Sequence, residues 1–152
     1  TATSQKNVAV EEAARERLLK FLNELELYAN MLTRADGFLH AAAGEIEGGK
    51  GASGYIFLEN GKPLFYQVET NAEELLNNRA EEQYKGEVRT LLQSAALFAG
   101  AARSFRNAIV FIEKEDKSAE ENFTRFLNEG KTAQQEAIRL ATAVKEFVAS
   151  SR

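Results

Sequence analysis

The feature that most constrains the fold is a seven-residue repeat of large apolar side chains in the first third of the chain. Its members are Leu18, Leu25, Leu32, Leu39 and Ile46. Smaller apolar residues stand between them at three- and four-residue spacing, a broad stripe that is typical of a helix packed in a bundle. Asp36-Gly37 is ordinarily a turn signal, but the seven-residue phase passes through it unchanged. We therefore expect one helix from about Val8 to about Glu47.

A different pattern follows a glycine-rich stretch at 48–54. The residues at 55–59 and 62–68 are mostly aromatic and aliphatic, and Asn60-Gly61 separates them. Asn-Gly between two such runs is the strongest short signal for a β-hairpin, because both turn residues must tolerate positive φ. The sequence therefore predicts a β-hairpin at about 55–69, inserted between the first and second long helices.

Two further helical segments are expected after the hairpin. The first begins at Thr70 or Asn71 and reaches about Ile112, and a second seven-residue series of aromatic and aliphatic side chains runs through it. The last segment, about 119–149, keeps a continuous phase through Gly130, so we favour one helix there. The single proline of the chain is consistent with long helices. The expected fold is mainly α: an antiparallel bundle of three long helices with one hairpin, the runner-up being a four-helix bundle split at Gly130.

The hairpin supplies the first set of candidate binding residues. If alternate residues point to opposite faces, as in a strand, both faces of the hairpin are apolar. An isolated two-stranded hairpin is only marginally stable in water, so other residues must cover these faces. Burial within the chain is one explanation, and contact with a partner or a second copy is the other. The candidate partner-binding residues are Tyr55, Phe57, Leu64, Phe65 and Tyr66.

A block of small residues supplies a second candidate. Folding the helix that contains 95–102 back on the last helix brings small side chains together, and they either allow close helix packing or leave an apolar pocket. Close packing is the favoured interpretation. The alternative is a pocket for a small hydrophobic ligand, lined by Ala99, Ala102, Gly130 and Ala133.

Asp36 is the one charge in the main apolar stripe of the first helix. Because an unpaired buried carboxylate is costly, we expect it to have a partner. Counting residues along antiparallel helices from the hairpin predicts a contact between Asp36 and Arg79.

The sequence argues against several kinds of function and functional site. The net charge of −4 and the scattered basic residues argue against nucleic-acid binding. The chain has no cysteine and one histidine, His40, and no serine stands in a nucleophile-elbow pattern. The longest uncharged apolar run, 95–102, is far shorter than the roughly 20 residues of a membrane span. We therefore expect no catalytic centre, metal site or cofactor, and no membrane insertion of this segment.

The function expected from these features is that of a soluble, non-enzymatic protein-interaction or assembly module. It would act through the hairpin end of the bundle and bind a protein partner or a second copy. The alternative is an extracytoplasmic helical-bundle sensor or small-ligand-binding domain, which the chain resembles in size and helix content. Such sensors need both chain ends at one membrane, and a four-helix path satisfies this whereas three long helices do not. Localisation stays open between the cytoplasm and an extracytoplasmic compartment.

Overall fold

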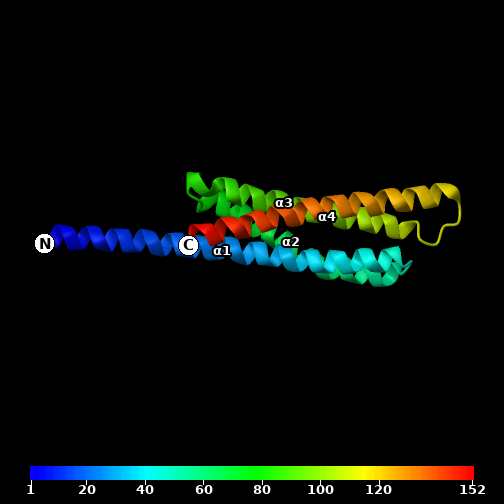
Figure 1. Cartoon of the computed structure of the whole chain (residues 1–152), viewed down its shortest axis with the longest axis horizontal. Coiled ribbons are helices and arrows are strands. Elements are labelled where there is room, and N and C mark those ends of the chain that lie inside the picture. The colour runs from blue at the N-terminus through cyan, green and yellow to red at the C-terminus, as the bar shows by residue number, and fades with distance from the viewer.

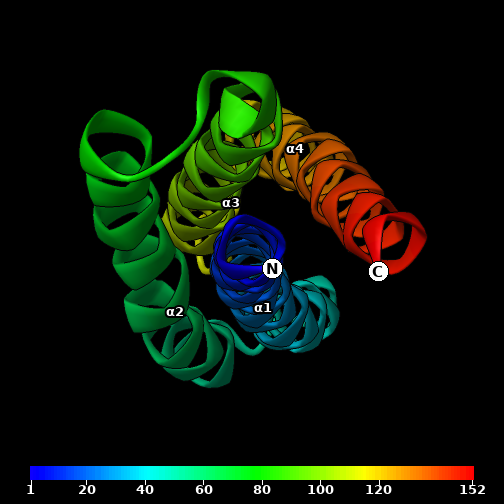
Figure 2. The same ribbon diagram turned by 90° about the vertical axis from the view of Figure 1, so that its left-hand side faces the viewer.

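The computed structural model describes all 152 residues and contains four helices (Figure 1). They are α1 (Ala2–Glu47), α2 (Gly51–Asn78), α3 (Lys85–Val110) and α4 (Lys117–Ser151), and one 3-10 turn, η1 (Glu82–Tyr84), precedes α3. Successive helices run antiparallel. Seen along the bundle, α1 and α3 meet across the centre, while α2 and α4 lie on opposite sides and do not pack on each other (Figure 2). Helices account for 91% of the residues, which confirms the prediction of a mainly helical chain.

The predicted β-hairpin at 55–69 is wrong, because this segment is part of α2. The buried residues of α2 follow an unbroken four–three helical spacing: Gly54, Leu58, Gly61, Phe65, Val68, Ala72 and Leu75. Gly61 faces α1, and a Cβ built on it would lie 3.1 Å from Cδ1 of Leu39. The glycine of the Asn-Gly pair therefore serves close helix packing and not a turn, because tertiary contacts override local propensity.

Pro63 lies inside α2 and is exposed. A proline at this position cannot donate a hydrogen bond to the carbonyl oxygen of Glu59, four residues earlier. Because Pro63 is on the solvent side of the helix, water can replace the missing donor, and the helix continues.

The expected number of long helices is also wrong, although two of the predicted helices are confirmed. α1 runs through Asp36-Gly37 without a break, and α4 runs through Gly130. The fourth helix comes from residues 51–78 and not from a split at Gly130. The predicted helix from 70 to 112 is interrupted, since α2 ends at Asn78 and α3 begins at Lys85.

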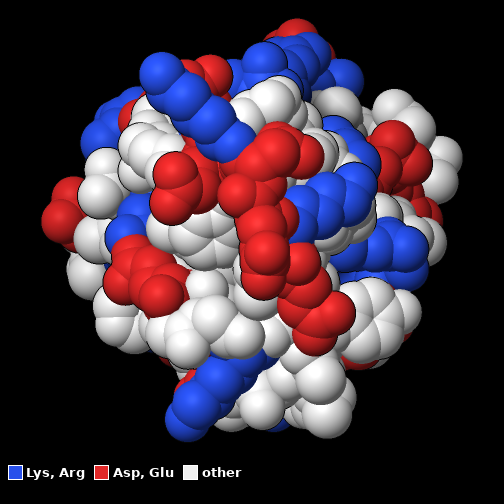
Figure 3. All heavy atoms as spheres, turned by 90° about the vertical axis from the view of Figure 1, so that its right-hand side faces the viewer, with Lys and Arg blue, Asp and Glu red and all other residues white.

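The helices are staggered along the bundle axis (Figure 1). At one end α1 extends beyond the other helices, and its residues 2–20 are exposed except for the half-buried Leu18. We call residues 2–20 the α1 extension. At the opposite end the α3–α4 connection lies beyond the α1–α2 connection, and acidic side chains run across this surface with lysines and arginines beside them (Figure 3). No helix has the combination of length and apolar content that crossing a bilayer requires.

Candidate functional site

The outer face of α2 carries three exposed apolar side chains. Tyr55 and Tyr66 are each 42% exposed, and Ile56 is 60% exposed. Tyr55 and Tyr66 are eleven residues apart, which is three helical turns, so both point to the same side of α2 about 16 Å apart. Both are among the predicted partner-binding residues. We refer to Tyr55, Ile56 and Tyr66 as the α2 face.

The other predicted partner-binding residues lie elsewhere on the same helix. Phe65 is 1% exposed and belongs to the core, while Phe57 and Leu64 are half-buried and pack against the core. A strand would have placed Phe57 and Leu64 beside the tyrosines. The helix instead turns them toward the interior, so it separates the five residues into an exposed pair and an inward-facing group.

Cationic side chains stand over both rings of the α2 face. The Lys62 ammonium nitrogen lies 5.8 Å from the ring centroid of Tyr66, and the guanidinium carbon of Arg106 lies 6.0 Å from that of Tyr55. Both distances are within the range of a cation–π interaction. Neither cation forms an ion pair with a carboxylate. Positive charge and exposed aromatic surface therefore occur together on this side of the molecule.

The predicted small-residue pocket falls at the packed interface of α3 and α4. Ala99 is buried, Ala102 and Ala133 are half-buried, and Gly130 is buried. A Cβ built on Gly130 would lie 2.6 Å from two ring carbons of Phe105. The phenyl ring of Phe105 therefore fills the space beside Gly130, as the close-packing interpretation expects.

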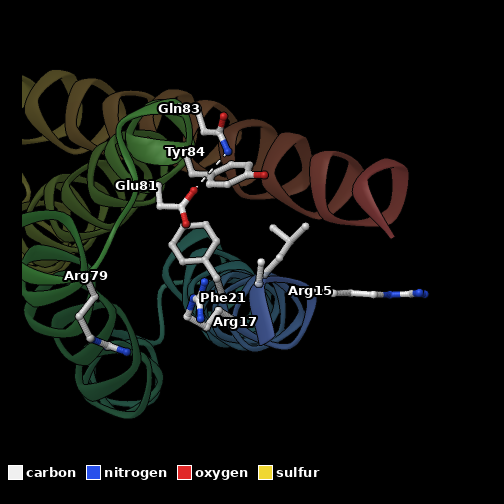
Figure 4. Close-up of a pocket in the computed structure, with 9 residues that line it drawn as sticks. Arg15, Arg17, Phe21, Arg79, Glu81, Gln83 and Tyr84 are labelled. Carbon is white, nitrogen blue, oxygen red and sulfur yellow. Dashed lines mark hydrogen bonds between the residues drawn. The ribbon is translucent and has the colours of Figure 1, made fainter. Parts of the chain in front are cut away.

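A groove of about 380 Å³ lies where the α1 extension meets the bundle (Figure 4). Its apolar surface includes Phe21 of α1 and Tyr84 of η1, whose ring centroids are 5.3 Å apart. Tyr84 also approaches Phe147 of α4 at 6.2 Å. These three rings join α1, the α2–α3 connection and α4 at one end of the bundle. Arg15, also on the groove rim, points away from it (Figure 4).

Beside this groove, Arg79 fastens the end of α2 to α1. Its Nη1 donates to Oε1 of Glu24 at 2.7 Å, and its Nη2 donates to Oε2 of Glu74 at 2.8 Å. These hydrogen bonds to Glu24 and Glu74 raise the pKa of Arg79. The Tyr28 hydroxyl donates to Oε2 of Glu24 at 3.3 Å. Burial, and then the charge of Glu24, raises the pKa of Tyr28.

The predicted contact between Asp36 and Arg79 is therefore wrong. Asp36 instead faces α4, where its Oδ1 accepts a hydrogen bond from Nε2 of Gln134 at 3.0 Å. The pair lies in a groove of about 470 Å³ between α1 and α4, which also contains His40 and the ion pair of Glu47 and Lys131. We call it the α1–α4 groove. Unlike the small-residue interface, it presents polar groups from two helices to solvent.

Sequence reasoning missed Gln134, although a signal for it exists. The buried face of α4 repeats at four–three spacing through Gly130, Ala137 and Ala141, and Gln134 is the polar residue in that series. Asp36 interrupts the stripe of α1 in the same way. Two polar interruptions on two core-facing stripes are expected to meet, because each needs a hydrogen-bond partner.

Comparisons of the chain with protein families, with curated proteins and with solved structures each return no match. No group of three or more His, Cys, Asp or Glu side chains is placed to hold a metal ion.

Proposed function

We propose that the chain is a non-enzymatic protein-interaction module that binds its partner through the α2 face. The observation that carries this proposal is the exposure of Tyr55 and Tyr66 on the same side of α2, with Ile56 exposed next to Tyr55 about a quarter turn further round the helix. Tyrosine is enriched at protein interfaces, because it offers a large rigid surface with a polar end. Single exposed apolar residues are ordinary, but two tyrosines on one side of a helix, each beside a cation without an ion pair and with Ile56 next to them, are a defined surface.

The charge of this surface indicates the chemistry of the partner. Lys62 and Arg106 lie over the two tyrosine rings, and Glu59 is the one carboxylate between the tyrosines on the same helix. A partner segment that combines acidic with apolar side chains would pair with the cations and cover the rings. The proposed partner is therefore an acidic amphipathic segment of another protein.

A pair of designed peptides tests this proposal. One is an amphipathic helix with glutamates on its polar side, and the other has the same sequence with lysines in their place. We expect the acidic peptide to bind the wild type, as measured by fluorescence anisotropy. The double variant Tyr55→Ser/Tyr66→Ser should bind this peptide at least about tenfold more weakly. The matched control is Val8→Ser/Val10→Ser, which removes two exposed apolar side chains from the α1 extension.

Circular dichroism must show that both double variants remain helical. The proposal fails when the lysine peptide binds as well as the acidic one, or when the tyrosine variant binds like the wild type. Sedimentation of the chain alone provides a separate check. Self-association that is lost in the tyrosine variant would identify a second copy as the partner.

A helical-bundle sensor is the second candidate function, and it is supported by the position of the first and last helices. α1 and α4 pack side by side, and Arg152 at the end of α4 donates to Oε2 of Glu26 at 2.7 Å. The buried part of α1 thus begins where α4 ends, as the four-helix path of such sensors requires. A ligand bound between α1 and α4 would contact both helices that reach this end.

A panel of amines, carboxylates and amino acids tests this second candidate. One class of compound should raise the thermal unfolding midpoint of the chain, and a panel without effect would remove this candidate.

A further inference from the structure

The α1 extension is a helix that almost nothing in the chain covers. Residues 2–17 are all exposed, and Leu18 is the one residue of the extension that packs against the core. In proteins most helical stability comes from the packing of one helix face and less from intrinsic propensity. The extension also contains poor helix formers such as Asn7, Val8 and Val10. A surface that packs on the extension would therefore stabilise its helical state.

One side of the extension is apolar and continues into the groove beside Tyr84. Val10, Ala14 and Leu18 follow one another at four-residue spacing, and Phe21 lies on the same side of the helix. Val10 is 60% exposed. The other three line the groove of about 380 Å³ at the base of the extension, where the Phe21 ring contacts that of Tyr84 (Figure 4). We call Val10, Ala14, Leu18 and Phe21 the extension face.

Two copies of the extension face can meet in only one orientation. Further along α1, the same side of the helix passes into Leu25 and Tyr28, which the other helices of the chain bury. In a parallel pair, the second bundle would therefore occupy the space that these helices already fill. In an antiparallel pair, the two bundles lie at opposite ends of the joined extensions, and each extension points toward the groove of the other copy.

Charged side chains beside the extension face fit this antiparallel pairing. Glu11 and Arg15 lie on one flank, four residues apart, and neither takes part in an ion pair. Because antiparallel pairing reverses the order of residues, Glu11 of each copy lies beside Arg15 of the other. Lys6 lies nearer the tip, so it approaches the other copy's groove, whose lining includes Arg17 and the unpaired carboxylate of Glu81. The extension is therefore complementary in charge to a second copy of itself.

We infer that the α1 extension is a dimer interface, through which two copies of the chain join their extension faces in an antiparallel pair. The interface is isologous, so each contact occurs twice about a two-fold axis that crosses the extensions between Val10 and Ala14. Val10 of each copy packs near Ala14 of the other, and the small side chain of Ala14 lets the two helices approach closely. The inference goes beyond the proposed function, because the α2 face takes no part in this contact.

Sedimentation velocity over a range of concentrations tests the inference with a matched pair of substitutions. Ala14→Glu puts a charge in the centre of the extension face, whereas Ala9→Glu puts the same charge on the far side of the same helix. Both alanines are exposed, so neither change disturbs the core, and circular dichroism checks that both variants stay helical. We expect the wild type and Ala9→Glu to dimerise. Ala14→Glu should raise the dissociation constant of the dimer at least about tenfold.

A charge exchange and two cysteine variants test the orientation. Glu11→Arg should weaken the dimer, and Glu11→Arg/Arg15→Glu should restore it, because opposite charges again meet across the pair. The chain has no cysteine, so a single introduced thiol reports on the distance between copies. Ala13→Cys, near the two-fold axis, should form a disulfide between copies. Thr3→Cys should not, because its two positions lie about 27 Å apart along the antiparallel pair.

The possible results separate this inference from the proposed function. A wild type that stays monomeric even at millimolar concentration overturns the inference, and so does an equal loss of dimer in Ala14→Glu and Ala9→Glu. Equal cross-linking at positions 3 and 13 overturns the antiparallel arrangement. The variant Tyr55→Ser/Tyr66→Ser should dimerise like the wild type. A dimer that this variant loses and that Ala14→Glu keeps would assign self-association to the α2 face and overturn the extension as the interface.

Discussion

The contact between Gly130 and Phe105 gives a prediction whose sign can be worked out from the structure. In Gly130→Ala, the new methyl carbon would lie 2.6 Å from two carbons of the Phe105 ring, whereas nonbonded carbons prefer about 3.5–4.0 Å. Phe105 is fully buried, so the ring cannot swing into solvent. Overpacking of this kind costs about 1–3 kcal/mol. The higher helix propensity of alanine offsets about 1 kcal/mol of this cost. The free energy of unfolding should therefore fall by about 1 kcal/mol in total.

Gly37→Ala is the matched control for this variant. Gly37 also lies inside a helix, but nothing is within 4 Å of a Cβ built on it. Only the higher helix propensity of alanine then acts, so the free energy of unfolding of this variant should rise by about 0.5–1 kcal/mol. Urea unfolding followed by circular dichroism should move the two midpoints in opposite directions, and the thermal midpoint of Gly130→Ala should fall by about 2–4 °C.

A second substitution checks the physical cause. Phe105→Leu shortens the side chain that the new methyl group meets, so the loss caused by Gly130→Ala should be smaller in the Phe105→Leu background than in the wild type. If Gly130→Ala and Gly37→Ala stabilise the chain equally, the close packing of α3 on α4 at Gly130 is refuted.

Three further predictions concern other parts of the bundle. Pro63→Ala restores a backbone donor inside α2 and should raise the free energy of unfolding by about 1–3 kcal/mol; an unchanged urea midpoint would contradict a helix at this position. The pKa of Tyr28 is raised, so the folded state holds the hydroxyl proton more tightly than the unfolded state does. The stability that this protonated hydroxyl confers is present below pH 10.0, the ordinary tyrosine pKa. It is lost as the pH rises above that value. Unfolding measured at about pH 8 and about pH 11 should therefore show a smaller alkaline loss in Tyr28→Phe than in the wild type. Asp36→Ala should cost about 1–3 kcal/mol because it strands the amide of Gln134, and Asp36→Asn should cost less; equal costs in urea unfolding would argue against that hydrogen bond.

The first helix was predictable because its stripe contains large side chains that keep one helical phase. Leu25, Leu32 and Leu39 keep one phase across Asp36-Gly37, and α1 is continuous as that phase predicts. The α2 stripe has the same spacing, but two of its seven positions are glycines. A glycine adds no hydrophobic signal, so its contribution, close approach to Ile46 and Leu39 of α1, is visible only once α1 lies against it.

The break between α2 and α3 has a signal that the sequence-based prediction overlooked. The α2 stripe ends at Leu75, and its four–three spacing would continue to the charged residues Arg79 and Glu82. The α3 stripe begins at Val88, and extending it backwards reaches Tyr84. The two stripes are out of phase, so one straight helix could not bury both.

The partner of Asp36 could not be found by counting residues, because that count depended on a hairpin that the chain does not form. With residues 51–78 helical, the relative positions of all later segments change. Arg79 then meets Glu24 and Glu74, and Asp36 meets α4. The polar character of Asp36 predicted that it needs a partner, whereas the identity of that partner depended on the path of the chain.

The stagger of the helices gives α1 the mechanics of a lever. α1 is one helix of 46 residues, about 69 Å long at 1.5 Å per residue. Its last contact with the core is made by the half-buried Leu18, one turn before the aromatic contact between Phe21 and Tyr84, and residues 2–17 lie beyond that point. Over this arm of about 24 Å, a tilt of about 5° at Leu18 displaces the tip by about 2 Å. A small change in the packing at this end of the bundle would therefore be enlarged at Ala2 into a movement of about 2 Å.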